Sequence, residues 1–107
     1  MANEFATLEI AQEGETTRVT FVDADGLDRI NISACKEQIT EIVKRNNTRT
    51  LAFDMRGVRL IPSGMLGLLA SLKSVVMTIE ILNPSEDVRE VLEVTKLNQL
   101  FVVRNEA

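Results

Sequence analysis

Histidine is absent from the 107-residue sequence, and cysteine occurs once, as Cys35. Without histidine, a serine or cysteine nucleophile has no imidazole base, and imidazole-ligated metal sites are excluded. A single cysteine forms no disulfide within the chain, which fits a reducing compartment such as the cytoplasm. Cys35 falls at an apolar position of a helical pattern, so we interpret it as a small core side chain.

Long apolar runs and a secretory leader are also missing. The longest apolar region, Met65 to Met77, is interrupted by Lys73 and is shorter than the roughly 18 residues that suggest a membrane span. The N-terminus MANEFATLEI has an early acidic residue and no basic segment before an apolar core, so we predict no signal peptide. These features predict a soluble cytoplasmic protein with no membrane insertion.

Basic residues are few and scattered along the chain. Twelve Lys and Arg stand against 16 Asp and Glu, which gives a net charge of −4. Phosphate contacts need clustered cations, so we expect no direct binding to nucleic acid. Hydrophobic residues make up 45% and charged residues 26%, and no linker, repeat or low-complexity tract is present. This composition predicts one folded domain over residues 1–107, with a core from about residue 5 to residue 103.

Several short apolar segments have the spacing of β-strands. Leu8 and Ile10 alternate with polar residues, as do Val19 and Phe21, and a Gly-containing turn at 12–15 separates the two pairs. This pattern predicts a β-hairpin with one buried face. Short apolar runs at 50–55, 77–82 and 100–103 predict three further strands.

Apolar positions three and four residues apart indicate three helices between these strands. The first begins at Asn31 and stops near Asn46–Asn47. The third has Asn83 as its predicted N-cap, Pro84 at its first helical position and Glu86 three residues after the cap. The predicted buried stripes are Ile32, Cys35, Ile39, Ile42 and Val43; Met65, Leu66, Leu68, Leu69 and Leu72; and Val88, Val91, Leu92 and Thr95.

The predicted order is β-β-α-β-α-β-α-β. An initial hairpin followed by βαβ-type units predicts an α/β domain with a mixed sheet, because crossover connections make the central strands parallel. Functional contacts in such sheets gather at loops beyond the carboxyl ends of the parallel strands. The segment from Met55 to Ser63 is one of these loops.

Ser63 stands in the segment IPSG, where this loop meets the second helix. As an N-cap, its hydroxyl would accept a free backbone N–H, which stabilises a helix by about 1 kcal/mol. A phosphoryl group on the same oxygen would lie beside the positive end of the helix dipole, so the helix would tolerate it. Gly64 would let an anion approach the backbone closely. Position alone leaves both roles open.

Other candidate sites have weaker patterns. The aspartates of DADGLD, at 23, 25 and 28, begin like a calcium loop, but Ala34 stands where the bidentate glutamate belongs. Asp54 at a strand end could orient a loop, and no second carboxylate or Gly-rich phosphate loop accompanies it. Arg56 and Arg59 could contact a partner's carboxylate or phosphate, or simply be solvated. We therefore predict no catalytic residues, no metal and no cofactor.

Two segments of the sequence resemble the STAS domain of bacterial anti-sigma factor antagonists. DMRGVRLIPSGMLG, residues 54–67, aligns without a gap to the family pattern D-L-S-G-V-x-F-I-D-S-S-G-L-G. LNPSEDVREVLEVTKLNQLF, residues 82–101, resembles the family's strand, N-P-S cap, third helix and L-T-G-L-D-x-L-F ending. GLD at 26–28 is a looser counterpart of G-E-L-D. The resemblance runs from about Leu8 to Val103.

The resemblance implies a regulatory binding module with no enzymatic activity. In the family, the unphosphorylated protein docks on an anti-sigma factor that is also an ATP-binding serine kinase, and this docking frees a sigma factor for transcription. Phosphorylation of the serine that aligns with Ser63 abolishes docking. We therefore expect Ser63 as phosphoacceptor, within a partner-binding surface that comprises Asp28, Asp54, Arg56, Arg59, Pro62, Ser63, Gly64, Met65 and Leu66.

Two departures from the family pattern keep an alternative open. Pro62 replaces the family aspartate before the acceptor serine, and Gly64 replaces the serine after it. STAS domains also occur as constitutive, unphosphorylated subunits of stress-signalling scaffolds and lipid-transporter complexes, and the loss of the aspartate favours that role. A small-ligand sensor with a pocket under the second helix is a third hypothesis.

Overall fold

The computed structural model describes residues 8–21 and 31–106. Its strands are β1 (Leu8–Gln12), β2 (Thr16–Phe21), β3 (Thr50–Asp54), β4 (Thr78–Leu82) and β5 (Val102–Arg104). Its helices are α1 (Ile32–Asn46), α2 (Ser63–Leu72), α3 (Glu86–Val94) and the short 3₁₀ helix η2 (Leu97–Gln99). The predicted order of strands and helices is confirmed.

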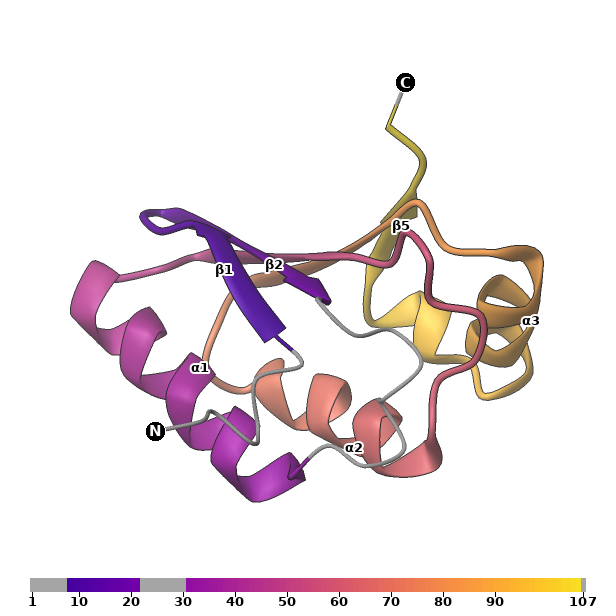
Figure 1. Cartoon of the computed structure of the whole chain (residues 1–107), viewed down its shortest axis with the longest axis horizontal. Coiled ribbons are helices and arrows are strands. Elements are labelled where there is room, and N and C mark those ends of the chain that lie inside the picture. Colours follow the sequence, from indigo (N-terminus) through magenta and orange to yellow (C-terminus); the bar gives the residue numbers. More distant parts are fainter. Residues whose placement is uncertain (1–7, 22–30, 107) are drawn as a thin grey trace.

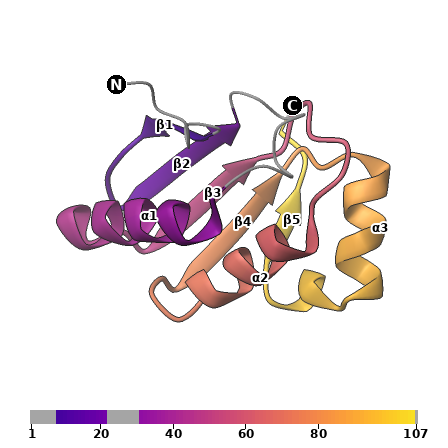
Figure 2. The same cartoon turned by 60° about the horizontal axis from the view of Figure 1, so that its bottom comes forward.

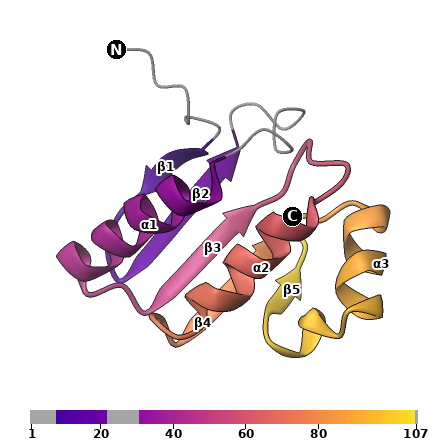
Figure 3. The same ribbon diagram turned by 90° about the horizontal axis from the view of Figure 1, so that it is seen from below.

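The strands form one mixed sheet in the order β1-β2-β3-β4-β5. β1 and β2 pair antiparallel, whereas β2, β3, β4 and β5 run parallel to one another. Helices α1 and α2 cover one face of the sheet, and α3 lies beside β5 (Figures 1 and 3). The opposite face, called the open face below, carries no helix of the described residues.

Alternation along the strands separates the core from the open face. The register aligns Val19, Phe53, Ile81 and Val103 in one row, which points toward the helices. Phe53 is 1% exposed and its ring lies 6.5 Å from that of Phe21. The next row, on the open face, consists of Thr20, Asp54, Leu82 and Arg104.

The predicted ends of α1 are confirmed. The Asn31 side chain accepts a hydrogen bond from the backbone N–H of Ala34 at 2.9 Å, as an N-cap does. Asn47 ends the helix in the left-handed conformation, with φ 51°. Cys35, Ile39, Ile42 and Val43 are buried on the inner side of the helix.

The predicted cap of α3 is wrong by two residues. Ser85 is the N-cap, and its hydroxyl accepts from the backbone N–H of Val88 at 3.1 Å. Asn83 instead takes the left-handed conformation, with φ 55°, and its side chain bonds Asp54 and Glu106. These long-range partners compete with local capping for the asparagine amide.

The remaining differences are small. Of the stripe predicted for α3, Val88 and Leu92 are buried, Val91 is half-buried, and Thr95 is exposed where the helix ends. The last strand starts at Val102 instead of Leu100, because η2 closes a turn in which the Phe101 N–H donates to the Leu97 carbonyl at 3.2 Å.

Gly67→Ala is expected to stabilise the protein. Gly67 lies on the exposed side of α2, and a Cβ added there would meet no atom within 4 Å. Alanine restricts the unfolded chain and favours the helix, so the free energy of unfolding should rise by about 0.5–1 kcal/mol. Urea denaturation measures this change, and a less stable variant would show that the outer side of α2 is not open.

Candidate functional site

The loop from β3 to α2 spans residues 55–62 and leaves the sheet at the carboxyl end of β3 (Figure 2). Met55, Val58 and Ile61 are each at most 8% exposed and anchor the loop to the core. Arg56, Arg59 and Leu60 are exposed between these anchors, and Leu60 is 67% exposed. The loop is therefore fixed at several points while it presents two cations and an apolar side chain.

The prediction that Ser63 caps α2 is wrong. Pro62 is the N-cap, with φ −63° and ψ 152°, and its carbonyl accepts from the N–H groups of Met65 at 3.0 Å and Leu66 at 3.2 Å. The proline ring fixes the φ of Pro62, which serves as the N-cap. The helix therefore begins at Ser63, one residue earlier than a cap at Ser63 would place it. Ser63 is exposed in the first turn of α2, and among the described residues its hydroxyl makes no capping hydrogen bond.

The next three residues differ in accessibility. Gly64 is exposed, and a Cβ at this position would lie 3.5 Å from Cγ1 of Ile32 at the start of α1. Leu66 is half-buried, whereas Met65 is 1% exposed and packs in the core. Met65 therefore supports the junction from beneath and offers no contact area to a partner.

Asp54 lies under the loop and is surrounded by hydrogen-bond donors. Its Oδ2 accepts from Arg18 Nη2 at 2.9 Å. Its Oδ1 accepts from the backbone N–H of Arg56 at 3.1 Å and from Asn83 Nδ2 at 3.3 Å. Asp54 is 8% exposed, so these bonds hold the first residues of the loop against Arg18 of β2 and Asn83, which follows β4.

The surroundings of Asp54 lower its pKa. Burial alone would raise the pKa, but hydrogen bonds from Arg18, the Arg56 backbone and Asn83 together outweigh burial. The same contacts act on their partners: the pKa of Arg18 is raised, first by Glu106 and then by Asp54. Hydrogen bonds from Arg18 are also the main reason that the pKa of Glu106 is lowered.

Asp54→Asn should reduce the dependence of stability on acid. Because the folded pKa of Asp54 lies below its ordinary value of 3.8, its contribution is fully present above that pH and is lost as the pH falls through the folded pKa. Asparagine does not titrate, so the slope of unfolding free energy below about pH 4 should be shallower. At neutral pH the variant should lose about 1–2 kcal/mol, because Arg18 loses a charged acceptor. Urea denaturation at several pH values measures both changes, and parallel pH profiles would contradict the assignment.

Other sequence-based candidates lie elsewhere. Asp28 and the calcium-like segment at 23–28 fall outside the described residues. Within residues 8–21 and 31–106, no three His, Cys, Asp or Glu side chains gather in a way that could hold a metal ion. Cys35 is buried, and burial raises its pKa, so its thiol is protonated at neutral pH.

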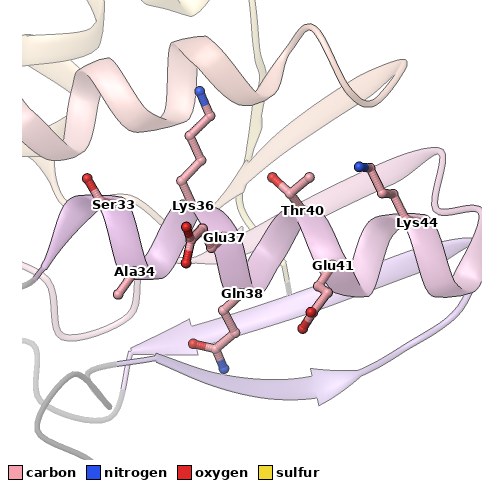
Figure 4. Close-up of a pocket in the computed structure, with 8 residues that line it drawn as sticks. All are labelled: Ser33, Ala34, Lys36, Glu37, Gln38, Thr40, Glu41 and Lys44. Atoms are coloured by element: carbon pink, nitrogen blue, oxygen red, sulfur yellow. The ribbon is translucent and has the colours of Figure 1, made fainter.

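A shallow groove follows the outer surface of α1 (Figure 4). Its lining residues all come from this one helix and are charged or polar except Ala34. This is the pattern of a solvated helix surface. The small-ligand hypothesis places its pocket under α2, and this groove lies elsewhere; its lining residues are Ser33, Ala34, Lys36, Glu37, Gln38, Thr40, Glu41 and Lys44.

Four residues of this region, Leu60, Arg18, Asn83 and Glu106, are not among the site residues predicted from the sequence. Leu60 could have been identified as a contact residue from the sequence, because it is an apolar residue of the loop that lies between the anchors Val58 and Ile61 and does not fit their three-residue spacing. β2 pairs parallel with β3, and Thr20 is the register partner of Asp54. Arg18 lies two residues before Thr20, so its side chain is on the same open face and close to Asp54. Glu106 has no such local signal, since it is 88 residues from Arg18 in sequence.

Solved structures with the same fold come from anti-sigma factor antagonists. SpoIIAA in its unphosphorylated form matches with a TM-score of 0.71 and 16% identity, over 94% of this chain and 86% of that one. A proposed anti-sigma factor antagonist from Thermotoga maritima matches with a TM-score of 0.68 and 16% identity, over 96% and 90%. No curated protein matches this sequence.

The family model of the STAS domain matches residues 10–107. No helix in the described part of the chain is long and apolar enough to cross a bilayer. The small mixed sheet and its three helices agree with this match. The chain belongs to the STAS domain family.

Proposed function

We infer that this chain is an anti-sigma factor antagonist-like binding module in the bacterial cytoplasm, which docks on an anti-sigma factor with serine kinase activity. The docking surface is the β3–α2 loop and the start of α2. The single observation that carries this proposal is the exposed Ser63 in the first turn of α2, directly after the loop that carries the exposed Arg56, Arg59 and Leu60. The fold shared with SpoIIAA, an anti-sigma factor antagonist, supports the choice of partner.

Phosphorylation of Ser63 would act on docking far more than on folding. A phosphate at this position adds nearly two negative charges at the positive end of the α2 dipole, where the helix tolerates them. Ser63 is exposed, so the group has room without repacking the core. On a docked surface the same charge would be desolvated or would face partner carboxylates, and either effect costs several kcal/mol.

Affinity capture from an extract of the source cell tests the partner. The wild-type chain should retain an ATP-binding protein kinase, and prior incubation of the bait with the kinase and Mg-ATP should reduce this retention. Mass spectrometry identifies the retained proteins. Retention of a partner that is not a kinase would contradict the proposal.

A second function is favoured by Pro62. The rigid proline stands directly before Ser63 and provides the N-cap of α2, in the position where the family has an aspartate. A constitutive subunit of a stress-signalling scaffold or a lipid-transporter complex would need no kinase recognition at this position. Such a subunit should form a stoichiometric complex whose stability is the same with and without ATP.

A further inference from the structure

Glu106 reaches back over the carboxyl end of the sheet on the open face. Its carboxylate accepts two hydrogen bonds from the Arg18 guanidinium, at 2.9 Å from Nη1 and 2.7 Å from Nη2. A two-pronged arginine–carboxylate pair fixes orientation as well as position. The backbone N–H of Glu106 donates to Asn83 Oδ1 at 2.7 Å. Main chain and side chain of this residue are therefore both held.

The burial of Leu82 indicates that this end of the open face is covered. Leu82 is in register with Asp54 on one side and Arg104 on the other, so its side chain lies on the open face with theirs. It is nevertheless 1% exposed. Arg18 and Glu106 are the groups that the hydrogen bonds bring to this end of the sheet. Glu106 is thus held against this end of the sheet.

Arg56 connects Glu106 to the β3–α2 loop. Its guanidinium Nη2 lies 3.4 Å from Glu106 Oε1, and its Nε lies 3.8 Å from Asp54 Oδ1. The Arg56 side chain is 63% exposed, so these ion pairs are weak and exchange readily. Arg56 is therefore directed toward carboxylates of its own chain, which compete with a partner for its guanidinium.

We propose that Glu106 is a clasp that restrains the β3–α2 loop and keeps Arg56 engaged within the chain, and that opening of the clasp frees Arg56 for an acidic group on a partner protein. Arg18 is the anchor, because it is bound to Asp54 at 2.9 Å as well as to Glu106. The release of Arg56 to a partner rests on the proposed function, since it takes the same loop as docking surface. The restraint of the loop by Glu106 needs no partner.

Limited trypsin digestion of the folded chain tests the clasp, because Arg56 is followed by Gly57 in the loop. Glu106→Gln removes the charge of the clasp with little change in shape, and Glu41→Gln makes the same change on the exposed outer surface of α1. Cleavage after Arg56 should become at least about fivefold faster in Glu106→Gln and stay unchanged in Glu41→Gln. Cleavage after Lys73, at the far end of α2, serves as the internal reference and should not change.

Equal cleavage after Arg56 in Glu106→Gln and wild type would overturn the clasp. Faster cleavage at every site would also overturn it, because a general loss of stability would then explain the result. A binding assay with the captured kinase tests whether release of Arg56 favours docking: Glu106→Gln should bind the kinase more tightly than wild type does. If cleavage changes as expected while the two proteins bind equally, the link to docking is overturned and the clasp stands. Failure to retain any kinase would instead refute the proposed function.

Discussion

Ser63→Glu should weaken binding to the kinase partner by at least about tenfold, which corresponds to about 1.4 kcal/mol. Glutamate places a permanent charge on the first helical residue of α2, at the centre of the proposed docking surface. A charge buried there would lose its water or face partner carboxylates. The thermal midpoint should change little, because an acidic residue in the first turn agrees with the helix dipole. Calorimetric titration with the purified kinase measures the affinity.

Two control variants separate charge at the junction from charge in general. Ser63→Ala removes the hydroxyl without adding charge, and it should retain the wild-type affinity within about threefold. Gln38→Glu adds the same single charge on the exposed surface of α1 and should also retain it. Undiminished binding by Ser63→Glu would exclude the start of α2 from the interface.

Phe53→Ala should produce the largest loss of stability, about 3–5 kcal/mol in the free energy of unfolding. Phe53 lies on the middle strand β3, is 1% exposed and stacks against Phe21. Alanine leaves a cavity between the sheet and its helices, which a close-packed core cannot fill by relaxation. Urea denaturation followed by circular dichroism measures the change.

The conservative variant Phe53→Leu provides the matched comparison. Leucine keeps most of the buried volume, so its cost should be well below that of alanine, at about 1–2 kcal/mol. A loss below about 1 kcal/mol for Phe53→Ala would mean that β3 is not packed beneath the helices as described. Because β3 leads directly into the β3–α2 loop, partner binding should fall together with stability in Phe53→Ala.

Much of the fold could be predicted because its signals are local. Alternation in β1 and β2 identifies the hairpin, and the three- and four-residue spacing from Cys35 to Val43 identifies α1 and its buried side. Short apolar runs predict the buried strands β3 and β4 to within one residue. Most of the residues that the periodicity selects are buried, whereas Ile10, Phe21 and Ile32 are half-buried and pack against the edge of the core.

The errors lie where distant residues or backbone constraints compete with local preferences. Asn83 has the sequence of an N-cap, but its amide is engaged by Asp54 and Glu106, so Ser85 caps α3. Ser63 has the chemistry of a cap, but Pro62 already has the extended conformation that starts α2. The interaction of Arg18 with Glu106 spans 88 residues, and no local pattern encodes it. Site residues could be proposed from the sequence, but their hydrogen-bond partners could not.

Phosphopeptide mass spectrometry of the chain purified from its source cell tests the central claim most directly. Trypsin releases the peptide LIPSGMLGLLASLK, residues 60–73, which contains Ser63 and Ser71. Fragment ions distinguish the exposed Ser63 from the half-buried Ser71. A phosphate on Ser63 in part of the protein, and its absence from the fraction that is bound to the kinase, is the result predicted for a switch. Recovery of this peptide only in its unmodified form, from both free and complexed protein, would contradict the switch and leave the chain as a constitutive STAS subunit.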